Sequence, residues 1–121
     1  MTETYDIDPE INALVGEWLN LKEAATALGL NQNRVKQLVG DGQLIALPFK
    51  GGLLIPAAFI EDGEIVKKLS GTLVQLKDAG YTDIEAFRWL FTDDDLPGSP
   101  IQALRENRGT EVRRRAQALG L

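Results

Sequence analysis

The sequence predicts a mainly α-helical fold in which one two-stranded β-hairpin separates an N-terminal group of helices from a C-terminal one. Apolar residues recur at helical spacing along most of the chain, and capping residues repeatedly precede them. Near the middle, two short apolar runs flank a Gly-Gly pair, which is typical of a tight hairpin. The 121 residues suffice for one compact domain, or for a small domain with a helical extension.

Composition excludes several classes of function. The chain contains no cysteine and no histidine, so it lacks the usual zinc ligands and the Ser-His or Cys-His pairs of nucleophilic enzymes. We therefore expect no cofactor, no metal site and no enzymatic activity. No apolar run approaches the roughly 18 residues of a membrane span, and the N-terminus lacks the layout of a signal peptide, so we expect a cytoplasmic protein with no membrane partner.

The net charge of −5 is concentrated at the start of the chain. Residues 1–20 contain five acidic residues and no lysine or arginine. Residues 21–60 instead carry a local excess of two positive charges. The charge of this middle segment is thus compatible with binding a nucleic acid. Because the segment has few lysines and arginines to neutralise phosphates, we expect a modest affinity that falls as the salt concentration rises.

Residues 1–8 are polar and acidic, and we expect them to form a mobile tail. Asp8-Pro9 is typical of a helix start, with Asp as the cap and Pro in the first turn. The apolar residues that follow recur at helical spacing and predict a first helix: Ile11, Leu14, Val15 and Trp18.

The next two helices form a helix-turn-helix in this interpretation. Asn20 and Glu23 make a capping box that opens a helix over residues 21–28, and Asn31 caps another that ends near residue 39. Between them, Gly29 tolerates the positive φ of a tight turn. Four residues earlier, the small side chain of Ala25 allows the two helices to cross closely.

The second of these helices has a polar outer face. Val35 and Leu38 are spaced to pack inward, which leaves amide and cationic side chains pointing outward without a single acid. Asn and Gln can pair with adenine, and Arg or Lys with guanine, in the major groove. The alternative is an ordinary solvated helix face. The candidate DNA-binding residues on this helix are Gln32, Asn33, Arg34, Lys36 and Gln37.

A β-hairpin follows, and it has the place of a wing. We expect strands at residues 44–47 and 53–55 around Phe49-Lys50-Gly51-Gly52, with the Gly-Gly pair supplying positive φ. Lys50 and the backbone at Gly51 are candidate phosphate contacts, and Lys22 at the start of the preceding helix is a third. The alternative is a hairpin that only covers the core. Pro56 then begins a short helical turn at residues 57–60.

The C-terminal half is expected to be helical throughout. Ser70, the Thr82/Glu85 capping box and Ser99-Pro100 each mark a helix start, and a last helix covers residues 110–119. The expected organisation is a tail at 1–8, a winged helix-turn-helix at 9–69 and a C-terminal helical bundle at 70–121. Phe87, Trp89 and Phe91 fall within an apolar helix and are interpreted as core.

Two resemblances support this interpretation. Residues 19–59 (LNLKEAATALGLNQNRVKQLVGDGQLIALPFKGGLLIPAAF) resemble the excisionase and MerR-type winged-helix module, in which the helix-turn-helix precedes a G-x-L strand and an I-P entry into a helix. About residues 15–119 more specifically resemble a mycobacterial and actinobacterial family of small winged helix-turn-helix DNA-binding proteins. The segments that carry this second resemblance are Gly71-Thr72-Leu73, Gly80-Tyr81, Arg88-Trp89-Leu90-Phe91-Thr92 and Glu111-Val112-Arg113-Arg114-Arg115-Ala116.

The second resemblance implies a protein that binds double-stranded DNA, acts in transcriptional or nucleoid-associated regulation and is a substrate of a Ser/Thr kinase. Thr2 and Thr4 in the acidic tail are the candidate phosphorylation sites, and phosphates there would weaken DNA binding by repulsion. Because one copy carries few cations, a homodimer through the C-terminal helices would raise affinity by adding a second half-site.

A second function class remains open from the sequence. The overall acidity and the aromatic C-terminal half also fit a protein-interaction adaptor, or an antitoxin-like module whose winged helix binds a protein. The arginines at positions 105, 108 and 113–115 are interpreted as a second phosphate-binding surface beside the wing, a site for an acidic partner, or a solvated helix face. Asp93-Asp94-Asp95 is interpreted as a solvated loop.

Overall fold

The structure is a computed structural model of the chain, and it describes residues 8–92 and 98–118. The tail residues Thr2 and Thr4 and the acidic run Asp93-Asp94-Asp95 lie outside the described residues. The helices are α1 (Pro9–Val15), α2 (Leu21–Leu28), α3 (Gln32–Gly40), α4 (Leu69–Asp78), α5 (Asp83–Phe91), α6 (Pro100–Arg105) and α7 (Gly109–Ala118). The strands are β1 (Trp18–Asn20), β2 (Leu47–Phe49), β3 (Gly52–Pro56), β4 (Ile60–Glu61) and β5 (Glu64–Ile65).

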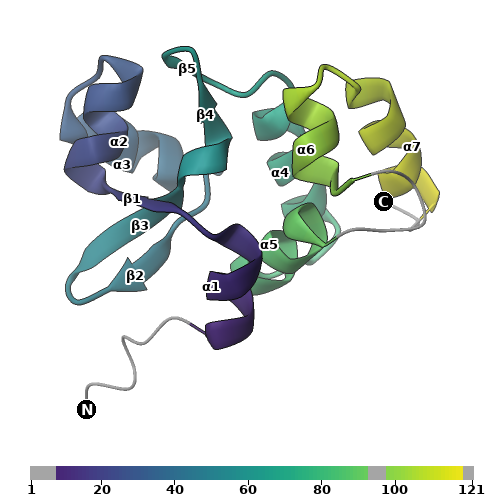
Figure 1. Cartoon of the computed structure of the whole chain (residues 1–121), viewed down its shortest axis with the longest axis horizontal. Helices are drawn as coiled ribbons and strands as arrows, with labels where there is room; N and C mark the ends of the chain where they lie inside the picture. The colour runs from purple at the N-terminus through teal and green to yellow at the C-terminus, as the bar shows by residue number, and fades with distance from the viewer. Residues whose placement is uncertain (1–7, 93–97, 119–121) are drawn as a thin grey trace.

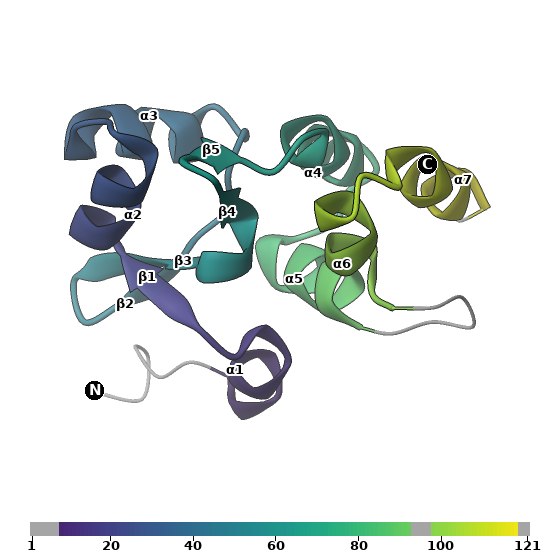
Figure 2. The ribbon, with the colours of Figure 1, turned by 45° about the horizontal axis from the view of Figure 1, so that its top comes forward.

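The predicted fold class is confirmed: the chain is a mainly helical winged helix-turn-helix followed by a group of helices. Figures 1 and 2 place α2, α3 and the tip of the β2–β3 hairpin at one end of the molecule and α7 at the other. The helix α1 lies beside α5, and Arg88 of α5 forms a 2.6 Å ion pair with Glu10 of α1. Within the described residues, no helix has the length and hydrophobicity needed to cross a membrane.

The prediction that Trp18 belongs to the first helix was wrong. Helical spacing suggested that Trp18 continues the first helix, but α1 ends at Val15 and Gly16 follows with φ of 83°. Trp18 instead begins β1, which pairs antiparallel with β3 in a sheet of order β1-β3-β2. Its indole N–H donates to Asn12 Oδ1 at 2.9 Å, and its ring meets Phe87 edge to face.

The wing differs in detail from its prediction. The first strand is Leu47–Phe49, whereas residues 44–46 are buried in the core without belonging to that strand. The turn is formed by Lys50 and Gly51, with φ of 49° and 80°, as in a type I′ hairpin. Gly52 does not take positive φ and pairs with Phe49 at the start of β3. A second, smaller hairpin joins β4 to β5 through a turn at Asp62 and Gly63.

Most predicted helix starts are confirmed by capping hydrogen bonds. Asn20 and Glu23 form both bonds of a capping box, at 2.7 and 2.8 Å. Thr82 with Glu85 does the same for α5, and the Ser99 hydroxyl accepts from an amide of α6. Ser70 is the exception, because α4 already begins at Leu69 and the Ser70 hydroxyl donates to the Gln43 carbonyl at 2.8 Å. The last helix begins at Gly109, one residue earlier than predicted.

One continuous hydrophobic core joins the winged helix to the C-terminal helices. Phe59, fully buried just after the wing, stacks on Phe87 and Phe91 of α5 with ring centroids 6.2 and 5.8 Å apart. The predicted core position is thereby confirmed for Phe87, while Trp89 and Phe91 are partly buried and pack against that core. The shared core fixes the helix-turn-helix against a rigid support.

Candidate nucleic-acid interface

The helix-turn-helix has the packing that its sequence requires. Ala25 of α2 and Leu38 of α3 are buried, and Val35 is completely inaccessible. Gly29 adopts the left-handed conformation with φ of 68°, so the chain changes direction within a few residues between α2 and α3. Asn31 then caps α3, since its side chain accepts from the Arg34 amide at 2.8 Å. These contacts hold α3 so that its opposite face meets solvent.

All five candidate residues of α3 are exposed on this outer face. They comprise two cations and three amides, and no acidic residue occurs between Gln32 and Gly40. Because amides and cations are the side chains that read bases and phosphates, the surface is chemically suited to a major groove. The candidates on this face are Gln32, Asn33, Arg34, Lys36 and Gln37.

One contact on this face went unnoticed in the sequence. Arg34 Nη1 donates a hydrogen bond to Gln37 Oε1 at 2.9 Å. The signal was present, because residues three apart on a helix are neighbours. The two side chains, predicted from the sequence to pair with separate bases, therefore also bind each other.

The remaining candidate residues lie on other elements at the same end of the molecule. Lys50 and Gly51 are exposed at the tip of the β2–β3 hairpin, which Figure 1 shows at the same end of the molecule as α2 and α3. The Lys50 ammonium lies over the Phe49 ring, 5.2 Å from its centroid. Lys22 is exposed in the first turn of α2. The structure thus places five candidates together on α3. The three phosphate-contact candidates lie on other elements, Lys22 on α2 and Lys50 with Gly51 in the hairpin turn.

The C-terminal arginines do not form one surface beside the wing, so that interpretation was wrong. The helix α7 lies at the other end of the molecule from the hairpin (Figures 1 and 2). Arg115 is buried, and it donates to Glu111 at 2.8 Å and to the Gly98 carbonyl at 3.3 Å. Arg108 forms ion pairs with Glu106 and Glu111. Only Arg113 and Arg114 of these five side chains are exposed.

The pKa shifts in this region reflect the same network. Hydrogen bonds from the Gln102 side chain and from Arg108 lower the pKa of the exposed Glu106 carboxyl. The pKa of Arg108 is raised, mainly by its hydrogen bonds to Glu111. These groups bind one another and therefore serve the packing of α6 against α7.

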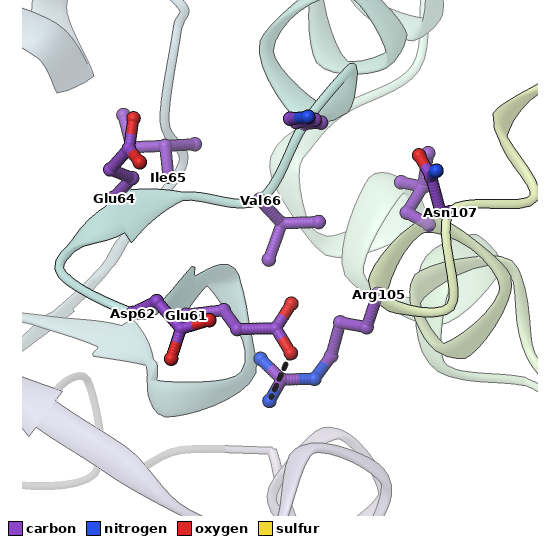
Figure 3. Close-up of a pocket in the computed structure, with 9 residues that line it drawn as sticks. Glu61, Asp62, Glu64, Ile65, Val66, Arg105 and Asn107 are labelled. Carbon is purple, nitrogen blue, oxygen red and sulfur yellow. Dashed lines mark ion pairs between the residues drawn. The ribbon is translucent and has the colours of Figure 1, made fainter.

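A hollow of about 240 Å³ lies between the β4–β5 hairpin and α6 (Figure 3). Arg105 and Glu61 point toward each other there and form a loose ion pair of 3.7 Å. Arg105 Nη1 also donates to the carbonyls of Ala58 and Ile60, at 2.8 and 3.3 Å. Because its guanidinium already binds these protein groups, Arg105 links the winged helix to α6.

Comparisons with known proteins agree with this architecture. The family described as DNA-binding protein Rv2175c, wHTH domain, matches residues 7–60. The family described as Rv2175c C-terminal domain of unknown function matches residues 66–120. The DNA-binding protein Rv2175c of Mycobacterium tuberculosis is 39% identical over an alignment that covers 83% of this chain and 78% of that protein. The NMR structure of Rv2175c superposes with a TM-score of 0.78 at 35% identity, covering 95% of this chain and 85% of that one.

Proposed function

The chain belongs to the family of DNA-binding protein Rv2175c, and from this premise we propose that it is a non-enzymatic protein that binds double-stranded DNA with α3 in the major groove. The observation that carries the proposal is the exposed outer face of α3, which holds amides and cations and no acid. A helix-turn-helix presents such a face to base edges through the first residues of its second helix.

Each candidate residue has a role in this proposal. Gln32, Asn33 and Arg34 lie in the first turn of α3 and face the bases. Lys36 and Gln37 follow one turn further along the same helix and complete the face that reads the major groove. Around them, Lys22 and Lys50 bind phosphates, and Gly51 lets the backbone of the wing approach the duplex because it has no side chain.

Regulation is the finer part of the proposal. On the family resemblance, we propose a role in transcription or nucleoid organisation in the cytoplasm, with a Ser/Thr kinase acting on Thr2 or Thr4. A phosphate there would add negative charge to a segment that already carries Glu3, so it would weaken DNA binding. Thr4→Glu should therefore bind duplex less tightly than Thr4→Ala in a gel-shift assay, and equal affinities would contradict the proposed control by phosphorylation.

A homodimer through the C-terminal helices is a separate part of the proposal. It would appear as a doubled mass in sedimentation.

The proposal is tested by selecting duplexes from a random pool with the purified full chain, at a low and a higher salt concentration. We expect enrichment of a defined sequence and weaker retention at the higher salt. A variant with Asn33→Ala and Lys36→Ala should lose the enrichment, whereas Arg113→Ala with Arg114→Ala on α7 should keep it. Wild-type protein that retains no duplex at low salt would refute DNA binding.

The adaptor alternative has lost one of its two supports. The aromatic residues that suggested a partner surface, Phe87 and Phe91, pack on Phe59 in the core. Its remaining support is the overall acidity of the chain. Stoichiometric co-purification of a protein bound through α3, together with no duplex retention, would favour that alternative.

A further inference from the structure

The hydrogen bond between Arg34 and Gln37 sets the chemistry of the base-reading surface. Arg34 is the third residue of α3, in the turn that meets base edges in a helix-turn-helix. Its Nη1 donates to Gln37 Oε1 at 2.9 Å, one turn further along. No acidic residue of α3 competes for the guanidinium. The bond therefore restricts a long side chain that would otherwise sample many rotamers.

The restricted guanidinium still has a free edge. Among the described residues, the only hydrogen bond of the Arg34 side chain is the one from Nη1 to Gln37. Nε and Nη2 are therefore left as two parallel donors, which is the fork that binds two acceptors in one plane. In the major groove, guanine presents two acceptors of this kind, N7 and O6, while adenine presents one acceptor and one donor.

The same bond changes the expected role of Gln37. Bidentate recognition of adenine requires the amide oxygen to accept from N6 while the amide nitrogen donates to N7. In this structure, that oxygen already accepts from Arg34. Asn33, on the same face one turn earlier, has no side-chain bond to another described residue, so its amide oxygen and its amide nitrogen both remain available for a base.

We propose that Arg34 reads a guanine in the bound duplex and that Gln37 is a positioning residue that holds the Arg34 guanidinium for it. The inference rests on the proposed DNA binding and adds to it a base identity and a division of roles. A preorganised side chain loses less entropy on binding, so the guanine preference depends on Gln37 although Gln37 does not contact that base.

The first arm of the test replaces single guanines in the selected duplex and measures wild-type affinity by fluorescence anisotropy. At one guanine, replacement of the pair by A·T should weaken binding by roughly 5- to 150-fold, the usual range for a bidentate contact. At that position 7-deazaguanine, which lacks N7, should also weaken binding. Inosine should not, because it keeps both N7 and O6.

The second arm measures the ratio of affinities for guanine and adenine at that position in variants. Arg34→Ala should abolish the preference. Gln37→Leu, which has similar size but no acceptor, should reduce it several-fold, and Gln37→Glu should retain it because a carboxylate also accepts from Arg34. A ratio is used because the added charge of Gln37→Glu lowers affinity for every duplex alike.

The outcomes separate the two proposals. Wild-type protein that binds no duplex would overturn the proposed function and, with it, this inference. Selective binding without a guanine that responds to 7-deazaguanine would overturn this inference and leave the proposed DNA binding standing. An unchanged guanine preference in Gln37→Leu, with circular dichroism equal to the wild type, would overturn the positioning role of Gln37.

Discussion

Replacing Lys22 and Lys50 by alanine together should flatten the salt dependence of DNA binding. Both side chains are exposed at the end of the molecule that carries α3, and neither forms an ion pair within the described residues. Each phosphate neutralised by a lysine contributes about 0.9 to the slope of log affinity against log salt. The double variant should therefore lose about 1.8 units of slope. When salt rises from roughly 50 to 200 mM, the factor by which the wild type loses affinity should be about 12 times the factor for the double variant.

The assay is fluorescence anisotropy on one selected duplex at four or more salt concentrations. The matched control is Arg113→Ala with Arg114→Ala, which removes two exposed charges from α7 at the other end of the molecule. This control should keep the wild-type slope. The reasoning would be refuted by a wild-type slope in the lysine variant, or by an equal loss of slope in both variants.

Further predictions concern stability. Asn20→Ala should lower the free energy of unfolding by about 1 kcal/mol in urea titrations, because it removes the cap of α2. Asn20→Asp should retain most of the wild-type stability, because an aspartate also caps a helix. Equal losses in the two variants would argue against the cap. Phe59→Ala should cost about 3–5 kcal/mol by the same measurement, since the ring is fully buried between the two halves, and a loss below that of Asn20→Ala would contradict this packing. The Thr82 amide lowers the pKa of Glu85, and Gln102 with Arg108 lowers that of Glu106. The stabilisation that these two ionised carboxylates give the folded state is present above their unfolded pKa of roughly 4.3. It is lost as pH falls through their lower folded pKa values. Changing both residues to glutamine should therefore lower the melting temperature more at pH 7 than at pH 3, and an equal drop at both would refute this linkage.

The features that the sequence predicted well are those encoded by neighbouring residues. The capping box of Asn20 and Glu23 is complete within four positions, and Gly29 follows from the backbone conformation that a tight turn requires. The outer face of α3 followed from the inward positions of Val35 and Leu38, because helical periodicity fixes what lies opposite them. Local chemistry alone was therefore enough to locate the candidate interface.

The errors arose where a distant residue decides the structure. Trp18 has helical spacing to Leu14, but it forms a strand because it pairs with Pro56, far along the chain. The Ser70 hydroxyl binds the Gln43 carbonyl instead of capping a helix. Arg115 was grouped with the exposed arginines, although Glu111 and the Gly98 carbonyl bind it in a buried position. Such tertiary partners leave no periodic signal in one sequence.

The contact surface itself is tested most directly by NMR titration of the ¹⁵N-labelled full chain with the selected duplex. We expect the largest amide shifts at residues 32–37 of α3, with smaller shifts at Lys22, Lys50 and Gly51, and little change along α7. Shifts confined to α4–α7, with α3 unaffected at saturation, would contradict the assignment of α3 to the major groove.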